Sequence, residues 1–311
     1  MTTSTREISF SSSSGLADIF AKAYYPAEAA DKKAVIQIAH GMAEHHERYE
    51  GFIDFLNQNG FVVYINDHLG HGKSISDDNE LGYFGKDAGY VNLVDDMKQL
   101  SDIAKEENPD LPFILFGHSM GSMLARLYTE KYSSMLDGVI YCGTTGPNPA
   151  ASAGIALTKM IAKFKGDHYR SEFINNLAFG AYNNKFKPAR TAFDWLTTDN
   201  EIVDKYIADP YCGFLFTAYG YRDLMILINV ISRADWYKAV PCSLPICIIS
   251  GADDPVGAYG KGIMKVFDSL AETSHDHIEY TLYEGMRHEI LNEPEKEKVY
   301  NDVLRWLESI I

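Results

Sequence analysis

The stretch "PFILFGHSMGSMLARLYTEKY", Pro112 to Tyr132, joins two kinds of secondary structure with almost no loop between them. The apolar run Phe113 to Phe116 predicts a short buried strand, and Ser122 to Lys131 predicts a helix. Only Gly117 to Gly121 separates the two. A turn this sharp holds its central residue, Ser119, in strained backbone geometry, with the side chain standing clear of the sheet.

The residues around this turn suit a nucleophile. Gly117 and Gly121 let the strand and the helix approach without clashes between Cβ atoms. Ser119 stands where the helix begins, and there free N–H groups and the helix dipole favour negative charge. The pattern G-x-S-x-G arises by chance in about one chain in ten of this length, so its position between strand and helix gives it weight. Ser119 is therefore the candidate nucleophile of a reaction that passes through an oxyanion.

Strands and helices alternate on both sides of the turn. Strands are expected in "REISF", "ADIFAKAYYP", "AVIQIAH", "FVVYIND", "PFILF", "LDGVIYCG", "LPICIIS" and "HIEYTLYEG". Helices are expected in "ERYEGFIDFLNQNG", "GYVNLVDDMKQLSDIAKEEN", the segment from Met120, Ala258 to Leu270 and "EKEKVYNDVLRWLESI". The inner strands are apolar throughout, as strands covered on both faces are. The sequence therefore predicts an α/β fold with a mostly parallel sheet and helices on both faces.

One long segment interrupts this alternation. From Pro147 to about Arg233 the chain is mostly helical, with aromatic and glycine interruptions such as "DPYCGFLFTAYGY". Sheet strands are expected on both sides of this segment, which favours an insertion over a separate domain. We therefore predict a core made of residues 1–146 and 236–311, and a helical cap made of residues 147–235.

A serine nucleophile needs a base and a group that orients the base. In a parallel sheet the residues that follow the strands meet at one edge. Asp253 and Asp254 follow the strand in "PICIISGADDPVG", and His288 follows the last strand, in "IEYTLYEGMRHEI". Pro255 biases Asp254 toward an extended backbone and fixes the direction of the following segment. His288 is the predicted base, and Asp254 is the predicted orienter.

The loop "IAHGMAEHHERY" is expected to complete the site. Gly41 permits a tight turn, and the N–H of Met42 can then point, with the N–H of Met120, at one oxygen atom. Two N–H donors directed at one oxygen form an oxyanion hole. His40 is expected to shape the loop and not to react.

Five motifs in order resemble one known family. The segments "HGMAEHHERY", "NDHLGHGKS", "GHSMG", "GADDPVG" and "YEGMRHEILNE" are similar to motifs of the monoacylglycerol lipases and lysophospholipases, a serine-hydrolase branch of the α/β-hydrolases. The resemblance runs from about Ile36 to Trp306. It implies Ser119 as nucleophile, His288 as base, an aspartate of "GADDPV" as orienter, and Met42 and Met120 as oxyanion donors. It also implies a helical cap over an acyl pocket.

The resemblance implies a reaction. The expected activity is hydrolysis of carboxylic esters with medium or long acyl chains, without a cofactor or a metal. Rival interpretations are an amidase or aminopeptidase, a short-chain or aryl carboxylesterase, and a binding protein on an inactive scaffold. An aminopeptidase needs an acidic pocket for an amine, for which Glu172, Asp194 or Glu201 are the candidates.

Composition limits the partners and the compartment. The chain has 28 Lys and Arg against 43 Asp and Glu, a net charge of −15, which disfavours nucleic acid and anionic surfaces. No apolar run is long enough for a membrane span, and no secretory signal is visible. The scattered cysteines, Cys142, Cys212, Cys242 and Cys247, are typical of buried thiols in a reducing compartment. We expect a cytoplasmic protein with a small-molecule acyl ester as its substrate.

Several other features have two interpretations. The pair His45 and His46 is a possible metal site, but solvated histidines on a first helical turn are commoner. The helix "AGIALTKMIAKFKG" either packs on the core or forms a lipid-facing rim that makes transient membrane contact. The aromatic residues Phe214, Phe216 and Tyr219 either line an acyl pocket or form the interior of the cap. The oligomeric state is left open.

Overall fold

The computed structural model describes residues 4–27 and 31–311, and within them one eight-stranded sheet has the order β1-β2-β4-β3-β5-β6-β7-β8. The pairs β1–β2 and β2–β4 are antiparallel, and the other neighbouring pairs are parallel. The strands are β1 (Ser4–Ser11), β2 (Asp18–Tyr25), β3 (Ala34–Ala39), β4 (Phe61–Asn66), β5 (Phe113–His118), β6 (Gly138–Cys142), β7 (Ile246–Gly251) and β8 (Ile278–Tyr283). The predicted α/β fold with a mostly parallel sheet is confirmed.

The apolar strands supply two hydrophobic layers at once. In β3, Val35 and Ala39 belong to one buried cluster, and Ile36 and Ile38 belong to the other. Successive side chains of a strand point to opposite faces, so a strand with apolar side chains on both faces needs cover on both. Helices α1 (Glu50–Gln58) and α10 (Lys296–Ile310) supply side chains to one cluster. The other cluster receives side chains from α2 (Gly89–Glu107), α3 (Met120–Tyr132), α7 (Ala218–Ile231), α8 (Ala234–Ala239) and α9 (Lys261–Ala271).

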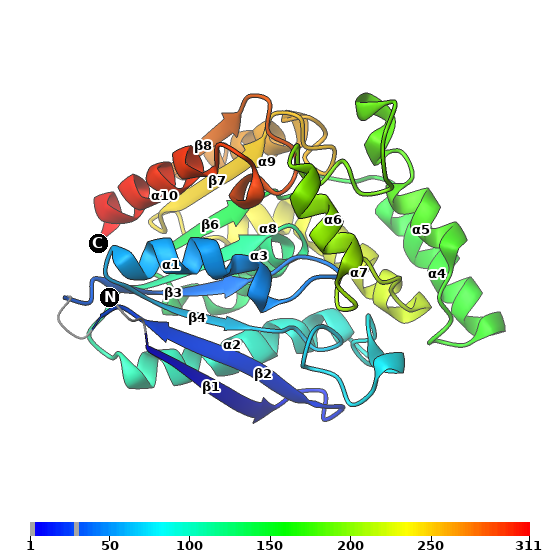
Figure 1. Cartoon of the computed structure of the whole chain (residues 1–311), viewed down its shortest axis with the longest axis horizontal. Coiled ribbons are helices and arrows are strands. Elements are labelled where there is room, and N and C mark those ends of the chain that lie inside the picture. The colour runs from blue at the N-terminus through cyan, green and yellow to red at the C-terminus, as the bar shows by residue number, and fades with distance from the viewer. Residues whose placement is uncertain (1–3, 28–30) are drawn as a thin grey trace.

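The helices around the sheet alternate with the strands in the chain (Figure 1). They are α1 (Glu50–Gln58), α2 (Gly89–Glu107), α3 (Met120–Tyr132), α9 (Lys261–Ala271) and α10 (Lys296–Ile310). Helix α9 begins three residues later than expected. Ala258, Tyr259 and Gly260 have φ angles of 51°, 57° and 82°, a left-handed backbone that cannot belong to a right-handed helix.

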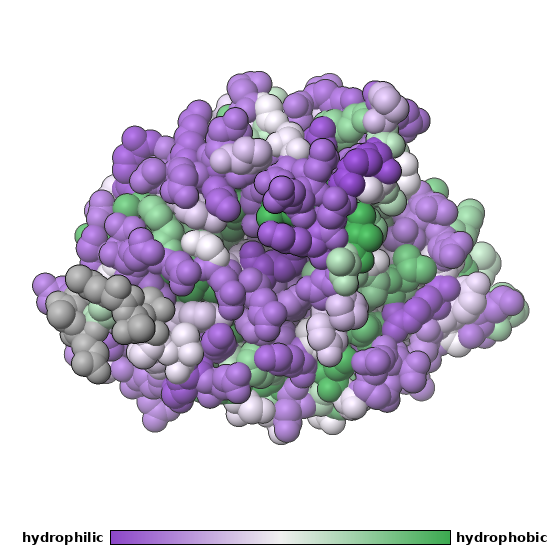
Figure 2. Space-filling model, in the orientation of Figure 1, coloured by the Kyte–Doolittle hydropathy of each residue, from purple (hydrophilic) through white to green (hydrophobic). Residues whose placement is uncertain are grey.

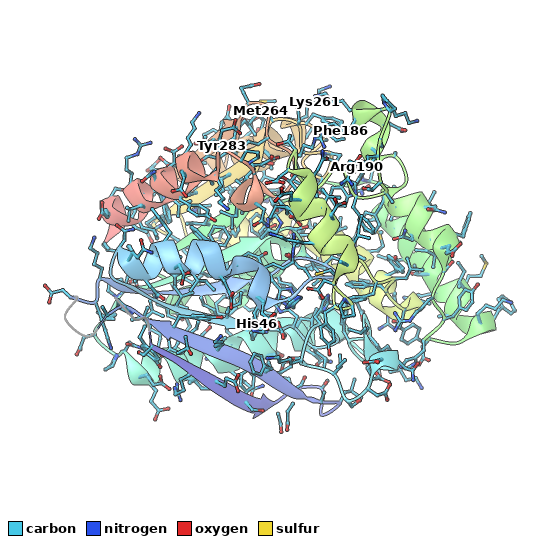
Figure 3. The ribbon with its side chains drawn as sticks, viewed as in Figure 1. His46, Phe186, Arg190, Lys261, Met264 and Tyr283 are labelled. Carbon is cyan, nitrogen blue, oxygen red and sulfur yellow. The ribbon has the colours of Figure 1, made fainter. Side chains whose placement is uncertain are left out.

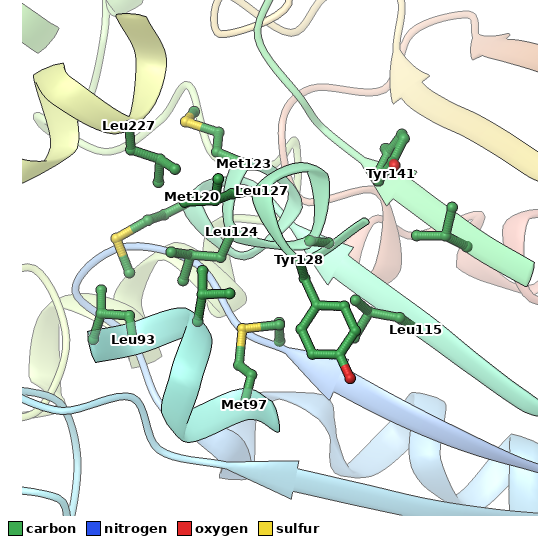
Figure 4. Close-up of a cluster of buried hydrophobic side chains, with 14 of the residues drawn as sticks. Leu93, Met97, Leu115, Met120, Met123, Leu124, Leu127, Tyr128, Tyr141 and Leu227 are labelled. Atoms are coloured by element: carbon green, nitrogen blue, oxygen red, sulfur yellow. The ribbon is translucent and has the colours of Figure 1, made fainter. Parts of the chain in front are cut away.

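Helix α3 follows the turn at Ser119 and runs through the centre of the protein. Its apolar side chains lie against α2, the sheet and α7, as Figure 4 shows. The labelled residues there are Leu93, Met97, Leu115, Met120, Met123, Leu124, Leu127, Tyr128, Tyr141 and Leu227. This packing on several sides fixes the direction of α3, and therefore the position of the residue that precedes it.

The inserted helices lie between β6 and β7 in the chain. They are α4 (Ala151–Lys165), α5 (Glu172–Phe179), α6 (Asn200–Ala208), α7 (Ala218–Ile231) and α8 (Ala234–Ala239). Figure 1 shows α4 to α7 gathered beyond one end of the sheet, and on the face seen in Figure 2 hydrophobic side chains gather between α6 and α4. The division into a core and a cap at residues 147 and 235 stays a prediction. Within the described residues, none of the helices combines the length and the apolar character needed to cross a bilayer.

Candidate active site

Ser119 occupies the strained turn that the sequence predicts. It lies between β5 and α3 with φ 53° and ψ −120°, a conformation that few residues other than glycine adopt. Its N–H donates to the carbonyl of Cys142 at the end of β6, at 2.9 Å. A Cβ atom on Gly121 would collide with the backbone carbonyl of Ala39, and one on Gly117 would collide with Gly121. The two glycines therefore allow the close approach of strand and helix that the turn requires.

His288 and Asp254 form a buried pair. The Nδ1 atom of His288 lies 2.9 Å from Oδ2 of Asp254, and the two side chains are only 2% and 0% exposed. Asp254 also accepts from the Ser250 hydroxyl at 3.2 Å and from the Val256 N–H at 2.8 Å. With Nδ1–H donating to the carboxylate, Nε2 of His288 is left as the proton acceptor.

The neighbouring aspartate is directed elsewhere. The carboxylate of Asp253 forms an ion pair with Lys185, outside the buried pair. The structure therefore brings Asp254, and not Asp253, to His288. Burial lowers the pKa of His288, but the charge of Asp254 and its hydrogen bond outweigh burial, so the pKa is raised above its ordinary value of 6.5.

The loop after β3 lies against the turn at Ser119. A Cβ atom on Gly41 would lie 3.2 Å from Cβ of Ser119, so the loop approaches the serine closely. The N–H groups of Met42 and Met120 have no acceptor in the described part of the chain, and both residues line the same cavity as Ser119. His40 is buried and accepts from the N–H of His68 at 2.9 Å, in agreement with a role in shaping the loop.

A cavity of about 720 Å³ brings the predicted residues together. Ser119, His288, Met42 and Met120 all line it, and Asp254 lies behind His288. Among the described residues no hydrogen bond joins Ser119 to His288, and catalytic hydrogen bonds often tighten only in the complex with substrate. Apolar side chains from the inserted helices form much of the wall, among them Leu157, Ile174, Leu177, Phe179, Leu224 and Ile228.

Sequence reasoning missed an ionic network beneath the site. Arg48 donates to Glu44 at 2.7 Å and to both carboxylate oxygens of Glu289 at 2.6 Å. Glu44 also accepts from the N–H of Gly41 at 2.6 Å. Burial raises the pKa of Glu289, but the charge of Arg48 outweighs it and holds that pKa below its ordinary value. The network connects the Met42 loop to the loop that carries His288. The spacing of Glu44 and Arg48, four residues apart, was the available signal.

The expectation of solvated histidines at positions 45 and 46 is wrong, because both are buried. The N–H and Nδ1 of His46 lie 2.8 and 2.9 Å from Oδ1 of Asp67, and the N–H of Lys73 donates to Oδ2 (Figure 3 labels His46). Asp67 therefore holds together two loops beside the site.

Some of the aromatic and acidic residues considered as pocket residues line the cavity, and others do not. Phe214 lines the cavity, whereas Phe216 packs against His71 and Phe84, and Tyr219 lies under the guanidinium of Arg222. The acidic candidates for an amine pocket, Glu172, Asp194 and Glu201, are not among the residues that line the cavity. Asp194 instead accepts from the N–H and the hydroxyl of Thr191.

Comparison with known proteins decides the family. Residues 30–295 match the family described as serine aminopeptidase, S33. The chain belongs to this family. This chain is similar to the solved structure of a highly thermostable carboxyl esterase from Bacillus coagulans in complex with glycerol. The TM-score is 0.92 and the sequence identity is 33%, over 98% of each chain. The α/β-hydrolase fold follows.

Two of the relatives of this chain are enzymes whose names refer to lipid substrates. A monoacylglycerol lipase of Mycolicibacterium smegmatis is 28% identical over 286 residues, which is 90% of this chain and 89% of the relative. The phospholipase YtpA of Bacillus subtilis is 25% identical over 268 residues, 86% of this chain and 92% of the relative. The family member described here is therefore a serine ester hydrolase.

Proposed function

We propose that this enzyme hydrolyses carboxylic esters of medium or long acyl chains, with monoacylglycerols as the first choice of substrate, through Ser119, His288 and Asp254. One observation carries the proposal. The buried His288–Asp254 pair and the strained Ser119 meet at one cavity whose walls are largely apolar. No cofactor enters the mechanism.

The proposed reaction has two similar halves. The Oγ of Ser119 attacks the ester carbonyl carbon while its proton passes to Nε2 of His288. The N–H groups of Met42 and Met120 stabilise the oxyanion of the tetrahedral intermediate. As the intermediate collapses, the alcohol leaves with the proton from His288. Water then attacks the acyl-enzyme by the same route, which releases the acid and restores Ser119.

The acyl chain is assigned to the apolar part of the cavity. Residues 147–235 act as a cap in this proposal, because the side chains that line the apolar wall come mainly from that segment. A long acyl chain that enters this space exchanges water for contacts with residues such as Leu157 and Leu224. Burial of this kind contributes about 25 cal/mol for each Å² of apolar surface, so longer chains are expected to bind more tightly.

The charges around the cavity favour an uncharged alcohol. Glu44 and Glu289 are the acidic residues that line it, and Arg48 is paired with both. The remaining polar lining includes amide groups, such as Asn175, whose Oδ1 accepts from the hydroxyl of Tyr221 at 2.8 Å. Neutral hydrogen-bonding groups suit a polyol such as glycerol better than a phosphate or an ammonium group. This supports monoacylglycerols over lysophospholipids and over the aminopeptidase rival.

A substrate panel tests the proposal. We expect the highest kcat/KM for monoacylglycerols, lower values for lysophosphatidylcholine of the same acyl chain, and no measurable turnover of aminoacyl p-nitroanilides. The p-nitrophenyl esters of the same acyl chains separate the contribution of the acyl group from that of glycerol. A higher kcat/KM for the aminoacyl amides or for the lysophospholipid would overturn the assignment.

The setting of the enzyme is part of the proposal. The cysteines Cys142, Cys212 and Cys247 are buried free thiols, which supports the cytoplasm, although Cys242 is exposed. We also propose transient membrane contact through the cap. Exposed apolar residues of α4 and α5 support this contact: Met160, Phe164, Phe173 and Leu177.

A further inference from the structure

Three side chains of types that bind metals lie close together where the loop after β3 contacts the segment after α6. They are His45, Asp209 and Cys212, and their ligand atoms all lie within 4.8 Å of one another. The Nε2 atom of His45 lies 2.8 Å from Oδ2 of Asp209. His45 and Cys212 are buried, and Asp209 is half-buried, so the cluster is accessible from one side.

The ligand types define the cation. An imidazole, a thiolate and a carboxylate are the three kinds of ligand that Zn²⁺ takes from proteins, at bond lengths of roughly 2.0 to 2.3 Å. Tetrahedral coordination at these lengths separates neighbouring ligand atoms by about 3.3 to 3.6 Å. The separation of His45 Nε2 and Asp209 Oδ2 therefore needs to widen by about 0.5 to 0.8 Å, and Sγ of Cys212, which lies within 4.8 Å of both, has to take the same spacing. A water molecule can take the fourth position.

The charges of the ligands can balance the charge of a divalent cation. Asp209 and a Cys212 thiolate supply two negative charges, and His45 binds as a neutral imidazole. The charge of Arg48 acts on Cys212, but Arg48 is paired with Glu44 and Glu289, which offset that charge.

A second group of metal-ligating side chains is less suited to a metal ion, because its carboxylate is already fully hydrogen-bonded. His45, His46 and Asp67 also have ligand atoms within 4.8 Å of one another. Both carboxylate oxygens of Asp67 already accept hydrogen bonds from His46 and Lys73. A metal there would leave buried N–H groups without partners, which costs more than it gains. In the Cys212 cluster, Asp209 Oδ1 keeps its bond from the Tyr211 N–H at 2.8 Å while Oδ2 turns to the ion.

We propose that His45, Asp209 and Cys212 bind one divalent cation of the zinc type, outside the catalytic residues. The site joins the inserted segment to the Met42 loop. Next to it, the N–H of Gly213 donates to the carbonyl of Ala43 at 2.9 Å. The ion therefore fastens the inserted segment to the loop that approaches Ser119, and its effect is on the stability of that junction. Ester hydrolysis does not require it.

Metal binding by the purified, chelator-treated enzyme tests the site. We expect one Zn²⁺ per chain by equilibrium dialysis, and a rise in Tm of about 5 °C or more when free zinc exceeds its Kd a hundredfold. Co²⁺ in place of zinc should give a thiolate-to-cobalt charge-transfer band. Cys212→Ser should remove the band and weaken zinc binding about 100-fold or more, and His45→Gln should weaken it similarly.

The exposed thiol of Cys242 provides the matched control. Cys242→Ser should leave the stoichiometry, the band and the Tm shift unchanged. The Tm of each metal-free variant shows whether it is folded, and two ligand variants guard against the failure of one. Absence of saturable zinc binding to the wild type would overturn the proposal. So would a band that disappears in Cys242→Ser but persists in folded Cys212→Ser.

Discussion

The directions of the Asp253 and Asp254 side chains determine which of the two carboxylates orients His288. The two are adjacent, yet one is paired with Lys185 and the other receives His288, Ser250 and Val256. The buried carboxylate fixes the imidazole in the tautomer that leaves Nε2 free. Its neighbour pairs with Lys185 instead.

Exchange of each aspartate for its amide tests this difference. Asp254→Asn should lower kcat by about 10³ to 10⁴, because an amide favours the wrong histidine tautomer. Asp253→Asn should cost less than about tenfold, since it removes only a half-exposed ion pair with Lys185. Ester hydrolysis by the two purified variants, each shown to be folded by its Tm, gives the ranking. The reverse ranking would mean that the loop register is wrong by one residue.

The pH dependence of kcat/KM reports on His288. As the proposed base His288 acts in its neutral form, and Asp254 raises its pKa above 6.5, so activity should rise with pH through an inflection above that value. The inflection should move to lower pH in Asp254→Asn, which removes the negative charge. Initial rates between pH 5 and 9 measure both. A profile that is flat over this range would count against His288 as the base.

Between elements, the site depends on loops that only the folded chain brings together. The sequence predicted Ser119, Asp254 and His288 because each follows a parallel strand, and the ends of parallel strands meet by construction. It did not predict the pairing of Arg48 with Glu289, because that contact joins loops 241 residues apart. Pattern reasoning also treated the inserted segment as one cap, whereas α7 contributes Leu224, Leu227 and Ile231 to the same hydrophobic cluster as the sheet.

Removal of the arginine tests the connection between the loops. Arg48→Met leaves Glu44 and Glu289 buried without their partner, and loss of one member of a buried ionic group costs about 3 to 5 kcal/mol. We expect a lower Tm and a lower kcat, since both the Met42 loop and the His288 loop lose their support. Thermal unfolding and initial rates measure the two effects.

An exposed arginine serves as the control. Arg305 pairs with Asp302 on α10 and its side chain is 76% exposed. Arg305→Met should therefore change the stability by no more than about 0.5 kcal/mol and leave kcat unchanged. Equal losses in the two variants would show that Arg48 has no special role.

For the whole molecule, buried neutral histidines limit the stability of the fold at low pH. Burial lowers the pKa of His68 to about 3 and those of His71 and His118 to about 4, and it lowers the pKa of His40 well below 6.5. Three of them, His40, His68 and His71, pack ring against ring behind the Met42 loop. The family motifs marked these positions, but their burial follows from the packing of loops and not from local pattern.

These histidines predict a loss of stability in acid. Each has a lower pKa folded than unfolded, so its contribution is fully present above pH 6.5 and is lost as the pH falls toward 4 or 3. Each histidine costs up to about 1.4 kcal/mol per pH unit in that window. The pKa values of His288 and His168 are raised and have the opposite sign, but these are two groups against five, because the pKa of His275 is also lowered. Thermal unfolding between pH 4 and 8 should show a steep fall in Tm below 6.5, and a constant Tm between pH 7 and 5 would contradict this account.

The central claim is that Ser119 is the nucleophile, and labelling with a fluorophosphonate probe tests it most directly. Mass spectrometry of the intact wild-type enzyme should show one probe molecule per chain, and peptide mapping should place the adduct on Ser119. The Ser119→Ala variant should keep its fold and take up no probe. Its ester turnover should fall by several orders of magnitude. Undiminished turnover in that variant, or an adduct on another serine of the wild type, would contradict the account.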